Sequence, residues 1–312
     1  MATVLITGGA GFIGSSLAHA CVARGDRVRV LDDLSTGRLA NLDGLGDGLE
    51  FVRGDIRDRA TVDATMDGVD RVFHQAALPS VLRSVEDPAA SHDVNINGLF
   101  NVLESARAAG VRRLVYAASS SAYGETPVLP KVEDMSPQPL SPYGVAKLLG
   151  EYYCSVWHHV YGMECVALRY FNVFGPRQSP DSDYAAVIPL FIKLIREGTP
   201  PTIHGDGGQT RDFCYIDNVV EANLKALDAP GAPGNVYNVA CGLRYSLLDL
   251  VDAINQSLGT SVVAHHGPPR AGDIRDSLAD ISAARRDLGY TASVEFGEGL
   301  RRTIQWFADG RA

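Results

Sequence analysis

Short apolar runs alternate with longer amphipathic segments through the first half of the chain. The runs of strand length are Val4–Thr7, Val28–Leu31, Phe51–Val52, Val69–Phe73 and Leu114–Ala118. Candidate helices lie between them, for instance Phe12–Arg24 and Asn97–Ala109, and each is followed by a glycine, Gly25 or Gly110. Strands that alternate with helices are typical of a parallel sheet covered on both faces. The pattern therefore predicts an α/β fold with a Rossmann-type, doubly wound parallel sheet.

The alternation continues to about residue 172 and then breaks down. A helix is expected over Tyr143–Tyr161 and a strand over Glu164–Tyr170. The segments that follow, such as "FGPRQSPDSDY" and "HGDGGQTRDF", are rich in Gly, Pro, Arg and Asp, which is typical of loops. The second half is therefore expected to be less regular than the first.

This change predicts two domains that no linker separates. Residues 1–172 are expected to form the larger, Rossmann domain, to which residues 217–240 return. Residues 173–216 and 241–312 are expected to form a smaller C-terminal α/β domain. A chain of 312 residues is longer than one small core usually organises, which agrees with this division.

The charge balance narrows the choice of ligand. The formal net charge is −9, which argues against a nucleic-acid-binding protein because a phosphate backbone requires a basic surface. A small anionic ligand remains compatible with this charge if a few Arg residues converge locally.

The cysteines and the N-terminus indicate a reduced, cytoplasmic protein. There are five cysteines, an odd number, and no CxxC motif occurs, so neither metal ligation nor a disulfide framework is expected. The N-terminal "MATVLITGG" has no basic segment before a long apolar stretch, and the longest apolar runs are too short to span a bilayer. We expect no signal peptide and no membrane segment.

A glycine-rich loop joins the first strand to the first helix. It reads "TGGAGFIG" over residues 7–14, so Gly9, Gly11 and Gly14 satisfy GxGxxG, and Gly8, Gly11 and Gly14 satisfy GxxGxxG. Glycines at these positions let the backbone approach a pyrophosphate at a helix N-terminus. Because a strand precedes the loop and a helix follows it, we expect a dinucleotide site here rather than a turn that binds nothing.

An acidic residue at the end of the second strand indicates which dinucleotide binds. Asp32 lies 18 residues after Gly14, where a carboxylate can accept hydrogen bonds from a ribose diol and repel a 2′-phosphate. This favours NAD over NADP. Asp33 is an alternative for the same role, and Asp55 in "RGDIRD" fits either an adenine-contacting loop or a turn at a strand end.

The segment "SPYGVAKLLGE" over residues 141–151 places Tyr143 four residues before Lys147. In a helix the two side chains lie on one face, one turn apart. A nearby ammonium group and a positively charged nicotinamide would both favour the phenolate. Lowering the pKa of a tyrosine by about three units needs roughly 4 kcal/mol of differential interaction and would make Tyr143 a general base. A YxxxK pair also arises by chance, so the remaining motifs decide its meaning.

Together with "TGGAGFIG", "AASSSAYGE" (117–125) and "RYFNVFGPRQ" (169–178), this segment resembles the extended short-chain dehydrogenase/reductase family. Within it, the chain is similar to the nucleotide-sugar 4-epimerases of the UDP-galactose epimerase type. The resemblance extends from Thr3 to the block "RAGDIRDSLADISAARRDLGY", which ends at Tyr290. It implies NAD as cofactor, a UDP-sugar as substrate bound by the smaller domain, and a homodimer.

The resemblance assigns roles to individual residues. Tyr143 would be the base, Lys147 would hold the nicotinamide ribose and lower the pKa of Tyr143, and Ser121 would bridge Tyr143 and the sugar 4-hydroxyl. The cofactor contacts would be Gly8, Gly11, Phe12, Ile13, Gly14, Asp32, Asp33, Ser35, Thr36, Gly37, Asp55, Ile56, Gln75, Ala76, Ala77, Asn95, Ser119, Tyr143, Lys147 and Tyr170. The substrate contacts would be Arg83, Ser121, Tyr143, Asn172, Arg177, Val187, Thr202, His204, Gln209, Arg211, Arg270, Asp273 and Ser277.

The resemblance implies a redox-neutral reaction in which C4 of a UDP-hexose is inverted through a transient 4-keto sugar. Related 4,6-dehydratases carry an Asp-Glu pair after the strand-end Ser or Thr, whereas this chain reads Ser121-Ala122-Tyr123 there. The Glu that decarboxylases of UDP-glucuronate usually have in this neighbourhood is also missing. Non-catalytic NAD-binding relatives commonly lose the Tyr or the Lys, and both are kept here.

The sugar itself stays open among three pairs: UDP-glucose and UDP-galactose, their N-acetylated counterparts, and UDP-glucuronate and UDP-galacturonate. Asn172 stands where uronate-specific relatives tend to have Thr, which disfavours a dedicated uronate enzyme. Ser277 stands where some bacterial UDP-galactose epimerases have a large aromatic residue, which predicts a permissive sugar pocket. Arg83 could still meet a carboxylate.

For the homodimer, relatives pair the helices that correspond to Asn97–Ala109 and Tyr143–Tyr161. The apolar positions of the first of these helices suit a helix interface and packing on the sheet equally well: Leu99, Val102, Leu103 and Ala106.

Overall fold

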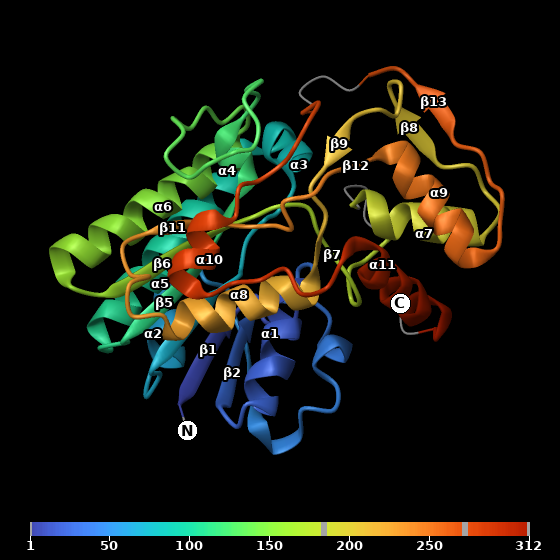
Figure 1. Ribbon diagram of the computed structural model, residues 1–312. Helices are drawn as coiled ribbons and strands as arrows, with labels where there is room; N and C mark the ends of the chain where they lie inside the picture. The colour runs from blue at the N-terminus through green and yellow to red at the C-terminus, as the bar shows by residue number, and fades with distance from the viewer. Residues whose placement is uncertain (1, 182–185, 270–273, 311–312) are drawn as a thin grey trace.

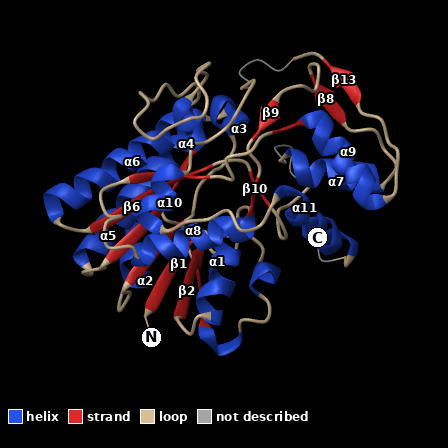
Figure 2. Cartoon of the chain, in the orientation of Figure 1, coloured by secondary structure: helices blue, strands red, loops and turns tan. Residues whose placement is uncertain are grey.

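The computed structural model describes residues 2–181, 186–269 and 274–310. Its largest element is a seven-stranded sheet in which every pair of neighbouring strands is parallel (Figures 1 and 2). The strand order is β3-β2-β1-β4-β5-β6-β11. The strands are β1 (Thr3–Thr7), β2 (Arg27–Asp32), β3 (Leu49–Arg53), β4 (Arg71–His74), β5 (Arg113–Ser119), β6 (Glu164–Tyr170) and β11 (Val236–Val239). The α/β fold class and the strands expected in the first half are confirmed.

Side chains that alternate along each strand enter two separate cores. In β1, Ile6 packs into the core on one face of the sheet and Leu5 into the core on the other. The first core is covered by α1 (Phe12–Ala23) and α8 (Ile216–Asp228). The second is covered by α2 (Arg59–Thr65), α5 (Leu99–Ala108) and α6 (Pro142–Tyr161). Both faces of the parallel sheet are therefore buried, as its apolar runs predict.

Helix α6 has strong signals at both ends. Ser141 is its N-cap and accepts a 3.0 Å hydrogen bond from the Gly144 amide, and Pro142 occupies the first turn. Gly162 ends the helix in the left-handed conformation with φ of 70°. These signals fix Tyr143 in the first turn of α6.

The connection from β4 to α5 is irregular. It contains the short helices α3 (Val81–Glu86) and α4 (Pro88–His92) and then a π-helical stretch, Asp93–Gly98. Regular α-helix begins only at Leu99, two residues later than the sequence pattern predicts. Short 3₁₀ helices occur elsewhere, at Leu39–Leu42, Gly46–Gly48 and Ser120–Tyr123.

The second half adds a smaller lobe built from helices and two-stranded pairings (Figure 1). Its helices include α7 (Val187–Arg196), α9 (Leu247–Leu258) and α11 (Phe296–Ala308), and α9 packs against the other two. Its strand pairs are β8 (Thr202–His204) with β13 (His265–Gly267), β9 (Thr210–Arg211) with β12 (Tyr245–Ser246), and β7 (Val173–Phe174) with β10 (Cys214–Tyr215).

Two segments from the second half pack on the larger lobe. Strand β11 adds to the main sheet beside β6, and α10 (Ser282–Leu288) packs against β11 and α8. The domain boundaries given above stay a prediction. Within the described chain, no helix has the length and apolar character needed to cross a bilayer.

Candidate active site

The main sheet opens at its carboxyl edge into a cleft of about 1360 Å³, where β1, β2, β4, β5 and β6 each contribute a residue or the loop that follows. In parallel α/β sheets this edge is where ligands bind. Most of the predicted cofactor residues line it: Gly8, Gly11, Phe12, Ile13, Gly14, Asp32, Asp33, Ser35, Thr36, Asp55, Ile56, Gln75, Ala76, Ala77, Ser119, Tyr143, Lys147 and Tyr170. Of the predicted substrate residues, Arg83, Ser121, Asn172 and Arg177 line the same cleft.

The glycine loop has the shape that a pyrophosphate requires. Gly8 has φ of +67°, and a Cβ on Gly14 would lie 2.2 Å from the Gly8 carbonyl oxygen. No side chain of the described chain caps α1 at Gly11, so the amides of its first turn face the cleft without a capping acceptor. The loop and the helix end therefore fit the diphosphate of a dinucleotide.

The two candidate ribose anchors differ in their surroundings. Asp32 is buried, and its carboxylate accepts hydrogen bonds from the Ala10 amide at 2.9 Å and the Leu34 amide at 2.8 Å. Burial raises the pKa of Asp32. Asp33 closes a local turn, because its Oδ1 accepts both the amide and the hydroxyl of Ser35. The structure thus ties Asp32, rather than Asp33, to the glycine loop.

Asp55 lines the same cleft, but its carboxylate is already paired with a neighbouring arginine. Arg57 donates to its carboxylate at 2.6 Å, and this contact lowers the pKa of Asp55. An adenine contact through the Asp55 carboxylate would have to share it with Arg57.

Tyr143 and Lys147 project from one face of α6, as the spacing predicts. Lys147 Nζ lies 5.8 Å from the centre of the Tyr143 ring and donates a 2.7 Å hydrogen bond to the Ala117 carbonyl. It also lies 5.1 Å from the centre of the Tyr116 ring. Lys147 is only 4% exposed, so a β5 carbonyl and an aromatic face replace water around its amine.

The electrostatics of the pair differ from the sequence prediction. Burial raises the pKa of Tyr143 to about 12, although a hydrogen bond with Ser119 acts in the opposite direction. Burial also lowers the pKa of Lys147 to about 7. Near neutral pH Lys147 is therefore only partly protonated and supplies less than a full charge to its neighbour. The residues of the chain alone do not produce the expected low pKa at Tyr143.

The end of strand β5 divides the serine triplet Ser119–Ser121, whereas the prediction places Ser121 at the strand end. Ser119 is the last residue of β5, whereas Ser121 lies in the 3₁₀ helix Ser120–Tyr123. Of the three hydroxyls, that of Ser119 is the one that acts to lower the pKa of Tyr143. Ser121 Oγ donates to Ser119 Oγ at 2.9 Å. Ser119 thus acts on Tyr143 and Ser121 hydrogen-bonds to Ser119, while the bridging role that the resemblance assigns to Ser121 stays a prediction.

Two supporting contacts carry no motif and could not be found in the sequence. The Tyr143 amide donates to Ser84 Oγ at 3.1 Å, which ties α3 to the first turn of α6. His74, at the end of β4, shares a 2.7 Å hydrogen bond with Thr7 Oγ1. Burial and the nearby Lys147 lower the pKa of His74 to about 3, so this imidazole is neutral.

Six further predicted substrate residues lie in the smaller lobe and do not line this cleft. Val187 begins α7, Thr202 and His204 belong to β8, and Arg211 belongs to β9. The Ser277 amide donates to the Thr210 carbonyl at 3.1 Å, which places Ser277 beside β9.

Gln209, just before β9, is 5% exposed and donates to the His204 carbonyl at 2.7 Å. Its Oε1 is buried and has no hydrogen-bond partner among the described residues.

Two predicted cofactor residues are placed outside the cleft lining, and two predicted substrate residues lie outside the described chain. Gly37 and Asn95 are absent from the cleft lining. Gly37 packs against Ala10, while Asn95 exchanges hydrogen bonds with the backbone of Leu78. Arg270 and Asp273 lie outside the described residues.

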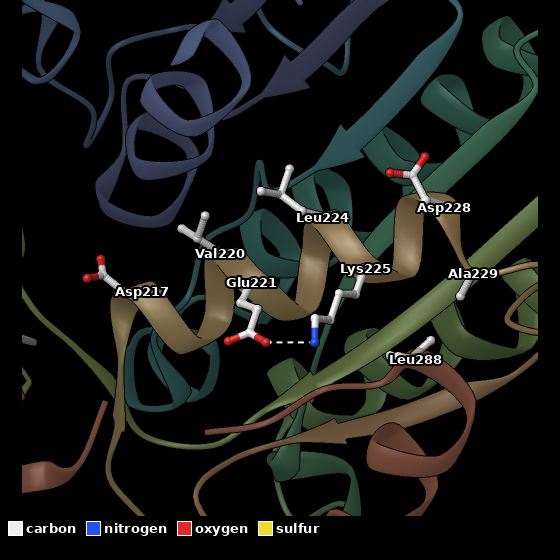
Figure 3. Close-up of a pocket in the computed structure, with 8 residues that line it drawn as sticks. All are labelled: Asp217, Val220, Glu221, Leu224, Lys225, Asp228, Ala229 and Leu288. Atoms are coloured by element: carbon white, nitrogen blue, oxygen red, sulfur yellow. Dashed lines mark ion pairs between the residues drawn. The ribbon is translucent and has the colours of Figure 1, made fainter. Parts of the chain in front are cut away.

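The described residues contain no group of three or more His, Cys, Asp or Glu side chains that could hold a metal ion. A shallower hollow of about 660 Å³ lies along α8 (Figure 3). Inside it, Glu221 and Lys225 pair at 2.8 Å. None of the predicted site residues lines it.

Comparison with known proteins gives consistent matches. The model of the NAD-dependent epimerase/dehydratase family matches residues 4–240. The chain is 39% identical to the UDP-glucose 4-epimerase of Mycolicibacterium smegmatis over 97% of each chain. The structure of UDP-glucose 4-epimerase from Thermotoga maritima with UDP-glucose gives a TM-score of 0.95 at 35% identity, covering 99% of this chain and 100% of that one. The UDP-N-acetylglucosamine 4-epimerase from Methanobrevibacter ruminantium, in complex with UDP-N-acetylmuramic acid, gives 0.93 at 37% identity over 99% of both.

Proposed function

The chain belongs to the NAD-dependent epimerase/dehydratase family, as its motifs predict, and we propose that it is an NAD-dependent UDP-sugar 4-epimerase. Its preferred reaction is the interconversion of UDP-glucose and UDP-galactose. UDP-N-acetylglucosamine and UDP-glucuronate are the alternative substrates.

The observation that carries this proposal is the convergence of three side chains beside the glycine loop. Tyr143, its hydrogen-bond partner Ser119, and Lys147 line the same cleft as Gly8 and Gly14. A base, a hydroxyl that can relay its proton, and a cation thus meet where a dinucleotide fits. When bound, NAD would supply the hydride acceptor for sugar C4 and a positive charge in the cleft.

Each residue has a defined task in the reaction. Tyr143 takes the proton of the sugar 4-hydroxyl, and the Ser119 hydroxyl favours the phenolate that results. Ser121 donates to Ser119 and so orients the Ser119 hydroxyl. Lys147 lies one turn below Tyr143 and holds the nicotinamide ribose. Because Tyr143 has a pKa of about 12 and Lys147 one of about 7, proton removal needs a positive charge beyond that of Lys147.

The smaller lobe would hold the UDP moiety while the 4-keto sugar turns. Arg211 and Arg270 would supply charge-assisted hydrogen bonds to the diphosphate, which suits the forked guanidinium group. The buried Gln209 Oε1 would accept a hydrogen bond from the nucleotide. Ser277, beside β9, would leave room for a substituent larger than a hydroxyl on the sugar.

Dehydration lacks the acidic pair that 4,6-dehydratases carry after the strand-end Ser or Thr. With Ser119 next to Tyr143, the following positions are Ser120 and Ser121, which are not acidic. A 4,6-dehydratase needs an acid and a base to eliminate water across C5 and C6 of the sugar. Inversion at C4 needs only the groups described above.

A second copy of this chain would cover an apolar stripe on α6. Val145, Tyr152, Val156 and Val160 are 50%, 54%, 45% and 65% exposed and recur at helical spacing on one side of the helix. The apolar positions of α5 named above are fully buried against the sheet instead. The homodimer would therefore form mainly through α6.

The proposal is tested by incubating the purified protein with each UDP-sugar, without added oxidant or reductant, and following the products by proton NMR. Equilibration of at least one pair of C4 epimers is expected. A 4-keto-6-deoxy product, a decarboxylated product, or no turnover of any pair would contradict the proposal. Tyr143→Phe serves as the matched control, because it keeps the ring and removes only the ionisable oxygen.

A further inference from the structure

Arg177 belongs to the segment that enters the smaller lobe, and it also contributes to the lining of the cofactor cleft. It follows β7, has φ of 70°, and lines the cleft together with Phe12 and Ile13. A positive φ is unfavourable for a residue with a Cβ, so the surrounding structure must hold this conformation against local strain. Backbone strain of this kind often accompanies a placed functional side chain.

The guanidinium group of Arg177 is attached to the first helix by a short relay. Its Nη2 donates to Ser16 Oγ at 2.9 Å, and Ser16 Oγ donates to the Phe12 carbonyl at 2.9 Å. Phe12 is the first residue of α1. The relay therefore holds the guanidinium beside the first turns of the glycine-loop helix.

This position is electrostatically unfavourable unless an anion is also present. The N-terminus of a helix carries a partial positive charge, so a cation is disfavoured there. Burial lowers the pKa of Arg177, and no carboxylate lies within ion-pair distance of it among the described residues. Asp217 is the acidic group that acts on it, from a greater distance. The Nε atom of Arg177 is buried and has no hydrogen-bond partner within the described chain.

We infer that Arg177 binds the pyrophosphate of NAD, not the diphosphate of the UDP-sugar, and so helps to hold the cofactor at the glycine-loop helix. This inference rests on the proposed function for the identity of the dinucleotide. The contact to Ser16 favours the cofactor, because Ser16 belongs to the helix whose first turn faces that diphosphate. The candidate ligands of the UDP moiety, Gln209 and Arg211, lie elsewhere in the smaller lobe, around β8 and β9, and do not line this cleft.

Through Arg177, retention of NAD would depend on the position of the smaller lobe. Arg177 follows β7, which pairs with β10, and β10 leads directly into α8. A movement of this segment would carry the guanidinium toward or away from the pyrophosphate. Arg177 therefore contributes to keeping NAD bound throughout the reaction, as a redox-neutral epimerase requires.

The experiment compares Arg177→Gln with Arg211→Gln, two changes that remove the same charge, one inside the cofactor cleft and one outside its lining. The dissociation rate and the Kd of NAD are measured on the purified protein, and the Kd of UDP is measured by titration of the NAD-bound form. Arg177→Gln should raise the Kd of NAD about 10- to 100-fold, the range expected for hydrogen bonds to a charged group, and leave the Kd of UDP within about twofold. Arg211→Gln should do the reverse.

Two further variants keep the test decisive if Arg177→Gln folds poorly. Ser16→Ala removes the anchor of the guanidinium without changing any charge, and should raise the Kd of NAD by a smaller factor. Arg177→Lys should restore part of the affinity that Arg177→Gln loses. A raised Kd of UDP with an unchanged Kd of NAD would overturn the inference in favour of substrate binding. Unchanged values for both ligands would overturn it in favour of a purely structural role. Because NAD binding is measured without turnover, failure of the proposed epimerase activity is a separate result.

Discussion

Replacing Lys147 by Met tests whether burial lowers the pKa of this lysine. The readout is the free energy of unfolding as a function of pH. Lys147 is buried, and desolvation lowers its pKa from about 10.5 to about 7. Between these two values the unfolded chain binds a proton that the folded chain does not, so the free energy of unfolding rises with pH in this window. One such proton contributes about 1.4 kcal/mol per pH unit. Between pH 7.5 and 9.5 the free energy of unfolding of the wild type should therefore rise by roughly 2 to 3 kcal/mol more than that of Lys147→Met.

The assay is urea unfolding of nucleotide-free protein at several pH values across this range, analysed as the difference between wild type and variant. The difference removes contributions from groups that both proteins share. Lys193→Met is the matched control, because Lys193 is an exposed lysine that pairs with Asp181 at 2.7 Å and has a raised pKa. The free energy of unfolding of Lys193→Met should change with pH as that of the wild type does between pH 7.5 and 9.5. Parallel pH profiles for wild type and Lys147→Met would refute the reasoning, since they would mean that the buried amine keeps an ordinary pKa.

Four further outcomes follow from the site. Tyr143→Phe should retain less than about a tenth of the wild-type rate with unchanged NAD content; a higher rate would remove Tyr143 from the role of base. Asp32→Ala should weaken NAD binding about tenfold or more and relax discrimination against NADP in parallel titrations, while unchanged values would point to another ribose anchor. Ser277→Tyr should reduce kcat/KM for UDP-N-acetylglucosamine at least about tenfold more than for UDP-glucose, and equal losses would show that Ser277 does not limit the pocket. Val160→Lys should convert the proposed dimer into a monomer in light scattering, whereas Val263→Lys, at a still more exposed valine, should not; a wild-type mass for the first variant, or a monomeric wild type, would reject the α6 interface.

Much of the architecture is readable from the sequence because it depends on local pattern. Strands buried on both faces must be apolar throughout, and the boundaries of β1, β2 and β6 follow from that requirement. The limits of α6 follow from Ser141 and Gly162, which act through their own backbone geometry. The glycine loop is equally local, since Gly14 cannot carry a Cβ beside the Gly8 carbonyl.

Features that depend on tertiary contacts could not be predicted. The triplet Ser119–Ser121 offers three similar hydroxyls, and only the end of β5 decides which one meets Tyr143. The sign of the pKa shift at Tyr143 depends on burial of both members of the pair, which the YxxxK spacing does not encode. The contact between Arg177 and Ser16 joins residues 161 positions apart.

The central claim is that C4 of a UDP-sugar is inverted by removing and returning the same hydrogen inside the site. The most direct measurement is epimerisation of the preferred UDP-sugar in D₂O, without added redox reagents, with NMR detection of the hydrogen on C4. The account predicts that both epimers carry protium at C4 after full equilibration, because the carbon-bound hydrogen never exchanges with solvent while Tyr143 handles only the hydroxyl proton. Deuterium at C4 would contradict the account, since it would require inversion by deprotonation of carbon.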